Sequence, residues 1–199
     1  MLNWRKQKID KMWSTNYLGT KNVVKWAIKS GIKKIIYISS IAVFGNNDNK
    51  TISESSRCMP MNIYARTKYA AEKLIRKDCI NNNIQYLILR PSNVIDSQRL
   101  NAYPLLNFIR SINNGHFFYV KNQENVYLNY ITIDNVVEIL KSMVTTSLNK
   151  NAVYILNNPI RLNNLVRSIA QYLKVKEPKR VIPYNVGCQL ATFGDVIQS

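Results

Sequence analysis

Tyrosine and lysine four residues apart are the first feature of this sequence that could carry out acid/base chemistry. On a helix, residues i and i+4 share a face, so such a pair brings a phenol close to an ammonium group. A nearby cation favours the phenolate and makes the tyrosine usable as a proton carrier. The spacing occurs at Tyr17/Lys21, Tyr64/Lys68, Tyr69/Lys73 and Tyr172/Lys176. Roughly one such pair is expected by chance in a chain this rich in both residues, so spacing alone selects none of them.

The sequence around Tyr64/Lys68 singles out that pair. The pair lies at the start of a predicted helix. A predicted strand ending in Ser39-Ser40 precedes it, with Tyr64 24 residues after Ser40. A second predicted strand is followed by Pro91-Ser92-Asn93. In parallel sheets, ligands bind beyond the carboxyl ends of the strands. Polar residues at these two strand ends are therefore the first candidates for a site.

The elements that must position these residues follow from alternating helical and strand periods. We predict helices at Asn16–Ser30, Ile63–Asn81, Pro104–Ile112, Asp134–Ser147 (with Asp134 as N-cap) and Leu162–Leu173. We predict strands at Lys33–Ser40, Ile84–Arg90, Tyr127–Ile133 and Ala152–Leu156. Gly31 suits a helix C-terminus, and the polar stretch Asn46–Asn62 is long enough to be a functional loop. The alternation predicts βαβ units, hence an α/β fold with a mostly parallel sheet covered by helices on both faces.

Length and charge narrow the function classes. A chain of 199 residues fits one domain, or one domain and a small lobe. The net charge is +17, but no run of five or more basic residues occurs. Charge spread in this way disfavours nucleic-acid binding and is typical of a solvated surface. It also suits an anionic small-molecule substrate.

Cysteine and histidine usage argues against a metal site. Cys58, Cys79 and Cys188 lack C-x-x-C spacing, and His116 is the single histidine, which we interpret as structural or solvated. We predict three free thiols in a reducing cytoplasm. The N-terminus has no apolar signal core, and no apolar run reaches the 18 or so residues needed to span a bilayer. We therefore expect an unexported protein without a membrane partner.

Five motifs in order resemble one family. They are N-Y-L-G-T-K-N-V (Asn16–Val23), I-S-S-I-A-V-F-G (Ile38–Gly45), Y-A-R-T-K-Y-A-A-E-K (Tyr64–Lys73), L-R-P-S-N-V-I (Leu89–Ile95) and Y-I-T-I-D-N-V (Tyr130–Val136). Together they resemble the extended short-chain dehydrogenase/reductase family of NAD-dependent epimerases and dehydratases. The resemblance runs from about Asn16 to Leu173 in the family's order.

The resemblance implies a catalytic role for three residues. Tyr64 would be the general acid/base, and Lys68 would hold the nicotinamide ribose hydroxyls and lower the pKa of Tyr64. Ser40 would bind the reacting oxygen of the substrate. Asn16 is expected to be a structural hydrogen-bonding residue under the site.

Four more residues would line the ligands. Pro91 and Ser92 would lie along the nicotinamide of NAD or NADP, and Asn93 would face the substrate. Ser39, beside Ser40, and Tyr64 would also contact the cofactor. The ordinary alternative is that Ser and Asn at strand ends satisfy backbone groups. No metal is implied.

The implied fold is a partial Rossmann-like sheet with part of a small C-terminal substrate lobe. Residues 1–95 would form the C-terminal part of a dinucleotide-binding domain, and residues 96–199 a substrate-binding lobe interleaved with the last strands. The family's turn G-x-x-G-x-x-G, which cradles the pyrophosphate, has no counterpart here. The resemblance also implies a possible homodimer, formed through the helices Asn16–Ser30 and Ile63–Asn81.

The implied function is an NAD(P)-dependent epimerase or reductase acting at a hydroxyl/carbonyl carbon of a nucleotide sugar or similar secondary alcohol. Ile41-Ala42 replace the Asp-Glu pair of the family's sugar dehydratases, which disfavours elimination. Leu128-Asn129 replace the Arg-Asp of many nucleotide-sugar enzymes, which weakens the case for that substrate. The alternative is a truncated, inactive remnant of the family that acts as a binding or scaffolding piece.

Overall fold

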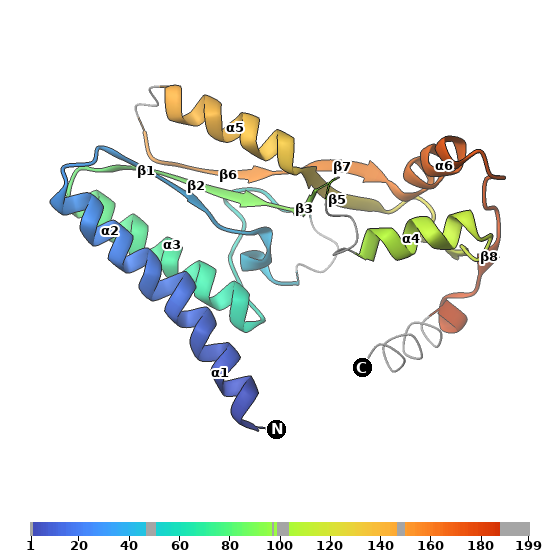
Figure 1. The fold of residues 1–199 in the computed structure, drawn as a ribbon, viewed down its shortest axis with the longest axis horizontal. Helices are drawn as coiled ribbons and strands as arrows, with labels where there is room; N and C mark the ends of the chain where they lie inside the picture. The colour runs from blue at the N-terminus through green and yellow to red at the C-terminus, as the bar shows by residue number, and fades with distance from the viewer. Residues whose placement is uncertain (1, 47–50, 97, 99–103, 147–149, 188–199) are drawn as a thin grey trace. The chain divides into compact units, whose positions relative to one another are not determined.

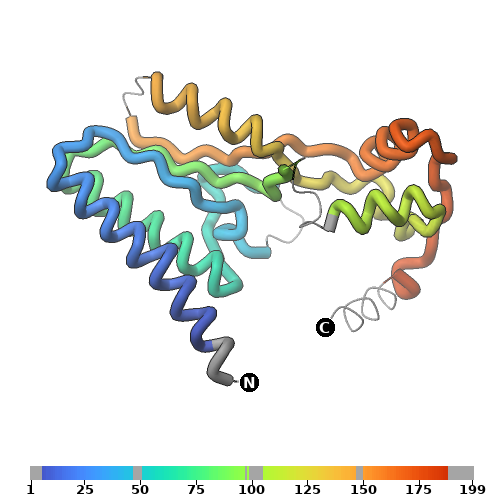
Figure 2. Tube along the Cα trace, in the orientation of Figure 1, coloured from blue at the N-terminus to red at the C-terminus, as the bar shows by residue number. Residues whose placement is uncertain are grey.

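The computed structural model describes residues 2–46, 51–96, 98, 104–146 and 150–187. The chain divides into two compact units, each built from two separate stretches of sequence. Unit 1 comprises Met1–Val94 and Ile133–Asn157, and unit 2 comprises Ile95–Thr132 and Asn158–Ser199. Figure 2 traces this path by colour, with blue, green and orange segments meeting in unit 1. No helix among the described residues is both long enough and apolar enough to cross a membrane.

Unit 1 is built on a three-stranded parallel sheet in the order β1-β2-β6. The strands are β1 (Lys34–Ile38), β2 (Gln85–Pro91) and β6 (Ala152–Leu156). β2 lies in the middle, where Leu87, Ile88 and Leu89 are completely buried. A continuous apolar run is what a strand covered on both faces requires. The parallel sheet and the α/β class predicted from the sequence are confirmed.

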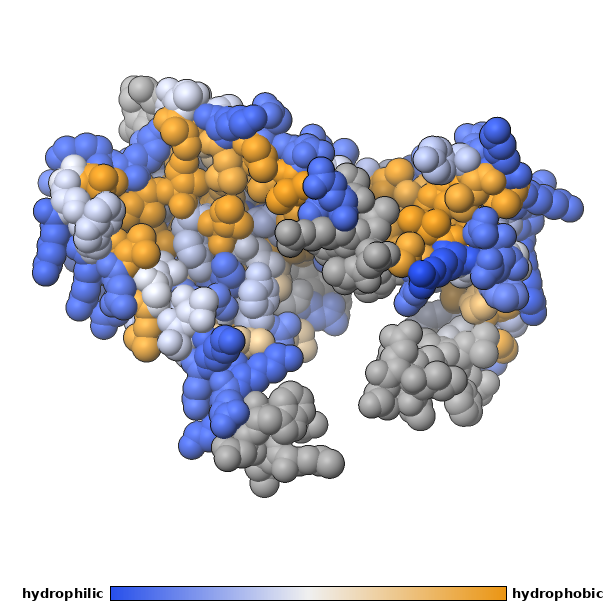
Figure 3. Space-filling view, in the orientation of Figure 1, coloured by the Kyte–Doolittle hydropathy of each residue, from blue (hydrophilic) through white to orange (hydrophobic). Residues whose placement is uncertain are grey.

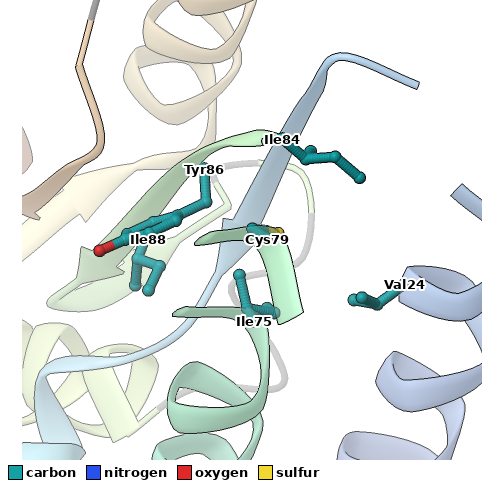
Figure 4. Packing of buried hydrophobic residues seen from close by; sticks show 6 residues of the cluster. All are labelled: Val24, Ile75, Cys79, Ile84, Tyr86 and Ile88. Carbon is teal, nitrogen blue, oxygen red and sulfur yellow. The ribbon is translucent and has the colours of Figure 1, made fainter. Parts of the chain in front are cut away.

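Helices cover both faces of this sheet. Figure 1 shows α2 (Thr20–Lys29) and α3 (Ile63–Asn81) on one face and α5 (Ile133–Thr145) on the other. The core under α2 and α3 is the cluster Val24, Ile75, Cys79, Ile84, Tyr86 and Ile88 (Figure 4). Burying each of its larger apolar side chains contributes about 1.5–3 kcal/mol. The cluster therefore fixes α3 against β2, which matters for the residues that α3 carries.

The N-terminal helix is longer than the sequence pattern predicts. α1 (Leu2–Trp13), a π-helical turn η1 (Ser14–Gly19) and α2 form one continuous rod beside α3 (Figure 1). The predicted start at Asn16 was wrong because α1 is largely polar and lacks the apolar stripe that marks a packed helix. The predicted end is confirmed, because Gly31 has a φ of +67° and the N–H of Ile32 donates to the carbonyl of Ala27 at 3.0 Å.

Unit 2 contains short strands and two packed helices. The helices are α4 (Pro104–Asn113) and α6 (Leu162–Leu173), with Ile112, Tyr119, Val166 and Ala170 in their core. Figure 3 shows hydrophobic residues gathered over these helices. β5 (Tyr127–Thr132) and β7 (Asn158–Arg161) pair antiparallel. The first strand in their sheet order β3-β5-β7 is β3 (Asn93–Ile95), whose first two residues belong to unit 1. β4 (Tyr119–Val120) pairs parallel with β8 (Val181–Ile182).

Several predicted boundaries are corrected. The strand expected over Lys33–Ser40 ends at Ile38, because the chain then turns into the 3₁₀ helix η2 (Ile41–Phe44). β5 ends at Thr132 and α5 begins at Ile133, which places Asp134 inside the first helical turn and not at the N-cap. β3, β4, β7 and β8 have two to four residues each, too few for a strand period to be visible in the sequence.

Candidate functional site

Ser39 and Ser40 lie where β1 ends and the chain turns. The N–H of Ser39 continues the ladder to the carbonyl of Leu89 at 2.6 Å. Ser40 caps η2, since its Oγ accepts a hydrogen bond from the N–H of Ala42 at 3.2 Å. A hydroxyl that accepts in this way keeps its own proton for donation to a second group. The turn thus presents Ser40 with its O–H available.

α3 begins beside this turn and carries the Tyr/Lys pair in its first two turns. Asn62 caps the helix, because its Oδ1 accepts from the N–H of Ala65 at 2.8 Å. Tyr64 lies in the first turn and is 39% exposed, so its phenol is accessible to a ligand. Lys68 lies one turn further along on the same face.

Lys68 connects α3 to the end of β1. Its Nζ donates to the carbonyl of Ile38 at 2.9 Å, and lies 5.1 Å from the centroid of the Tyr37 ring and 6.0 Å from that of Tyr64. Burial lowers the pKa of Lys68 and raises the pKa of Tyr37 to about 12. Tyr37 therefore stays a neutral phenol at physiological pH and offers Lys68 an aromatic face.

The end of β2 supplies the neighbouring part of the site. The N–H of Ser92 donates to the carbonyl of Leu156 at 2.9 Å, and Pro91 and Ser92 are buried, whereas Asn93 is exposed. The side-chain hydroxyls of Ser39 and Ser92 are buried and have no hydrogen-bond partner among the described residues. Because buried polar groups are nearly always paired, these two hydroxyls fit a site that receives polar groups of a ligand.

Asn16 supports the helix beneath Tyr64. Its Nδ2 donates to Oγ1 of the buried Thr67 at 3.0 Å, and that hydroxyl donates to the carbonyl of Tyr64 at 2.8 Å. The π-helical turn η1 carries Asn16, and such turns often occur at functional sites. The contact agrees with a structural role for Asn16, which stays a prediction.

The loop before α3 contacts Gly45, which follows η2, and Ile155 on β6. Gly45 has a φ of +69°, and a Cβ there would clash with the carbonyl of Met59. The carboxylate of Glu54 accepts from the N–H of Ile155 on β6 at 3.1 Å, and this hydrogen bond lowers the pKa of Glu54. Residues 51–62 contain no helix or strand, and the functional role expected for this loop stays a prediction.

A buried ion pair under the site escaped the sequence analysis. Arg90 Nε and Nη2 donate to Glu72 Oε1 and Oε2 at 3.0 and 2.7 Å, with the two residues 2% and 0% exposed. The guanidinium Cζ lies 4.7 Å from the centroid of the Phe44 ring. An arginine in an apolar strand was the available signal, because a buried charge requires a partner. Among the described residues, no group of His, Cys, Asp and Glu could hold a metal ion.

The structure thus places the predicted residues around the carboxyl ends of β1 and β2. Ser39 and Ser40 lie on the turn after β1, with the Tyr64 and Lys68 helix joined to it at Ile38. Pro91 and Ser92 lie at the end of the adjacent strand β2, and Asn93 begins β3. Their catalytic and binding roles remain predictions.

Comparison with known proteins relates this arrangement to one family. The family model of the NAD dependent epimerase/dehydratase family matches residues 2–156. N-acetyl-alpha-D-glucosaminyl-diphospho-ditrans,octacis-undecaprenol 4-epimerase of Escherichia coli O157:H7 is 30% identical over 180 residues, covering 88% of this chain and 53% of the relative. The chain spans about half the length of the curated relatives it matches.

Solved structures share the fold. UDP-glucuronic acid 4-epimerase from Bacillus cereus, in complex with NAD, has a TM-score of 0.67 at 17% identity, covering 84% of this chain and 56% of that one. RMD from Pseudomonas aeruginosa, complexed with NADPH, has a TM-score of 0.69 at 21% identity, covering 92% and 66%. At these identities the likeness concerns the Rossmann-like fold, which the sequence motifs predicted. With the family match over most of its length, the chain belongs to the NAD dependent epimerase/dehydratase family.

Proposed function

We propose that the protein containing this chain is an NAD(P)-dependent epimerase or reductase acting at a hydroxyl/carbonyl carbon of a nucleotide sugar or a similar secondary alcohol. The observation that carries the proposal is the 2.9 Å hydrogen bond from Lys68 Nζ to the carbonyl of Ile38. It joins the helix that carries Tyr64 to the strand end that leads into Ser40. This contact supports the proposal that Tyr64 as proton carrier, Lys68 as cation and Ser40 as hydroxyl donor act together at one strand end.

The described residues fit the nicotinamide end of a dinucleotide. The ammonium of Lys68 has three N–H donors, of which Ile38 takes one, so the others are available for ribose hydroxyls. The unpaired hydroxyls of Ser39 and Ser92 could receive polar groups of the ring. When bound, NAD or NADP accepts and returns a hydride at the substrate carbon. The six glycines of the chain include no G-x-x-G-x-x-G, so the proposal assigns no pyrophosphate contact to its residues.

Residues of this chain would transfer the proton and stabilise the charge that develops during the transfer. The phenolate oxygen of Tyr64 would take the proton from the substrate hydroxyl as the carbonyl forms, and the resulting phenol would return it in the reverse step. Ser40 would donate a hydrogen bond to the same oxygen while the N–H of Ala42 holds its Oγ. Lys68 would supply positive charge close to the charge that develops during the transfer.

The substrate class rests on the relatives. The Bacillus cereus protein is a UDP-glucuronic acid 4-epimerase, and the Escherichia coli relative is an epimerase named for a sugar linked through diphosphate to undecaprenol. Both names describe a sugar attached to a diphosphate. The excess of basic residues, 28 against 11 acidic ones, suits such an anionic substrate.

The test is turnover of a small substrate panel by the complete protein that contains this chain. UDP-glucose, UDP-glucuronic acid and UDP-N-acetylglucosamine are incubated with NAD or NADP, and C4 epimers are resolved by proton NMR. A diphosphate-linked polyprenyl sugar forms a second arm. We expect a C4 epimer, or a keto sugar formed together with NADH or NADPH, from at least one substrate. The absence of both turnover and dinucleotide binding would favour the inactive remnant, a binding or scaffolding piece.

A further inference from the structure

Arg90 contacts two other elements from a fully buried position. Among the described residues, Arg90 is the largest fully buried side chain by volume, with 2% of its surface exposed. Its guanidinium forms the two-pronged pair with Glu72 on α3, at 3.0 and 2.7 Å. The Cζ of the same group lies over the ring of Phe44, the last residue of η2, at 4.7 Å from the ring centroid. One side chain of β2 thus touches both α3 and η2.

These contacts reach the elements that carry the candidate site. Glu72 lies one helical turn beyond Lys68 and two turns beyond Tyr64. Phe44 ends the short helix that Ser40 caps. Hydrogen bonds of the ladder hold β1 to β2, but helix α3 has no ladder with either strand, so side chains decide its rotation and its shift along its axis. A bidentate arginine–carboxylate pair fixes both, because its two parallel bonds allow one relative orientation.

Stability by itself does not account for such a pair. Removing two charges from water costs several kcal/mol per ion, and apolar replacements of a buried pair are often neutral or stabilising. A packed leucine and methionine would fill the same space without that cost. The pair differs from an apolar contact in the fixed geometry that it imposes on Glu72 and Phe44.

We propose that Arg90 is a positioning residue that sets the separation of Ser40 from Tyr64 and Lys68 by holding Phe44 and Glu72 simultaneously. The proposal rests on the proposed function, since it concerns the geometry of that site. In this role Arg90 acts through Phe44 and Glu72, and not through contact with the substrate or the cofactor. Its effect on turnover passes through the turn after β1 and the first turns of α3.

The kinetic test compares variants of the complete protein. Arg90→Lys keeps the charge but loses the planar fork, and the double variant Glu72→Leu/Arg90→Met replaces the pair by apolar packing. We expect kcat to fall about 10- to 100-fold in both, with KM changed less than about threefold. The thermal midpoint of the double variant should stay within about 5 °C of that of the wild type. A wild-type kcat in the double variant, or a change in KM without a change in kcat, would overturn the proposal.

Arg76→Lys is the matched control. Arg76 Nη2 lies 3.7 Å from the same Glu72 carboxylate, but the Arg76 side chain is 36% exposed and lies on α3 itself, so its ion pair with Glu72 does not link α3 to another element. The Arg76 Cζ lies 5.8 Å from the ring centroid of Tyr86 on β2, a cation–aromatic contact that a lysine can keep. We expect Arg76→Lys to keep the wild-type kcat. A kcat loss in Arg76→Lys equal to that in Arg90→Lys would show that any cation at Glu72 suffices, which contradicts a role for the Arg90 fork.

Amide hydrogen exchange separates this proposal from the proposed function. In Arg90→Lys, amides of residues 40–45 and of the first turn of α3 should exchange at least about tenfold faster, because both segments lose their common contact. The Ser92 amide bonded to Leu156 should exchange as before. Unchanged exchange in either segment overturns the proposal even if the wild type is active. Faster exchange in both, without turnover of any sugar, upholds the coupling and overturns the proposed function alone.

Discussion

The surroundings of the four Tyr/Lys pairs differ more than their spacing does. Lys68 donates a hydrogen bond to the carbonyl of Ile38, on another element. Lys73, in contrast, lies 4.6 Å from the ring centroid of its own partner Tyr69. Tyr172 is 87% exposed on unit 2. The spacing alone therefore does not distinguish the four pairs. Tyr64/Lys68 is distinguished by the strand that precedes its helix.

Replacing Tyr64 by phenylalanine tests its assignment as the proton carrier. The change removes the hydroxyl but keeps the ring, so kcat should fall by about two to four orders of magnitude with little change in substrate binding. Steady-state kinetics of the complete protein measures both quantities. Tyr69→Phe and Tyr172→Phe are the controls, and an equal loss in either would contradict the assignment.

The two described cysteines should differ in reactivity. Both are free thiols, but Cys79 is completely buried and burial raises its pKa to about 11, whereas Cys58 is partly exposed. Burial also raises the pKa of Cys58, and the positive charge of Arg90 opposes that rise. Because the thiolate is the reactive form, iodoacetamide at pH 8 should label Cys58 in the native protein and Cys79 only after unfolding.

Mass spectrometry of intact and unfolded protein reads out this order. Equal native labelling of both thiols would contradict the buried position of Cys79. A stoichiometric internal disulfide under non-reducing conditions would contradict the prediction of free thiols. Cys188 lies outside the described residues, and its state stays a prediction.

At the scale of elements, the turn after η2 has one position where a side chain cannot fit. Gly45 and Gly31 both have a φ near +70°, but an added Cβ meets the Met59 carbonyl at Gly45 and no atom within 4 Å at Gly31. Gly31→Ala should therefore cost about 1 kcal/mol of unfolding free energy for the backbone conformation alone. Gly45→Ala should cost about 1–3 kcal/mol more, because the loop must move and because a ψ of −148° at this φ is a conformation that essentially only glycine adopts. Urea denaturation measures the difference, and equal costs would show that the approach to Met59 is not rigid.

Long, periodic elements were predictable from the sequence, and contacts between distant residues were not. α3 and α6 have the predicted bounds. α6 has an apolar stripe of several turns, and α3 is a long helix with Asn62 as its N-cap and Asn82 as its C-cap. α1 was missed because a polar helix that continues into α2 leaves no period to detect. β7 was missed because four residues around Pro159 do not read as a strand.

The sequence predicted the candidate-site residues that belong to motifs, and it did not predict the contacts that depend on tertiary packing. Ser39, Ser40, Tyr64 and Lys68 stand in motifs, and their elements meet as a parallel sheet requires. Nothing local marks Glu72 as the partner of Arg90, because the two are 18 residues apart and on different elements. The contact of Lys68 with Ile38 likewise depends on how α3 packs on the sheet.

At the scale of the whole molecule, the purified 199-residue chain should bind dinucleotides weakly. Lys68, Ser39 and Ser92 offer contacts for a nicotinamide ring and its ribose, but the pyrophosphate needs several backbone N–H groups at a glycine-rich turn, and the sequence contains no such turn. Isothermal titration with NAD and NADP measures the affinity. A dissociation constant in the low micromolar range, roughly −7 to −8 kcal/mol, would overturn this expectation.

Because unit 1 is built from two separate stretches of sequence, neighbouring strands of its sheet are synthesised at different times. β2 is finished at Pro91, but its neighbour β6 ends at Leu156, and residues 95–132 of unit 2 are made in between. At about 5–20 residues per second, β6 follows β2 by roughly 3–13 s. During that interval the flank of β2 that β6 will cover, including Leu87 and Leu89, has no strand beside it. The nascent chain thus passes through a stage in which chaperones, or a second nascent chain, can compete with β6 for the same edge.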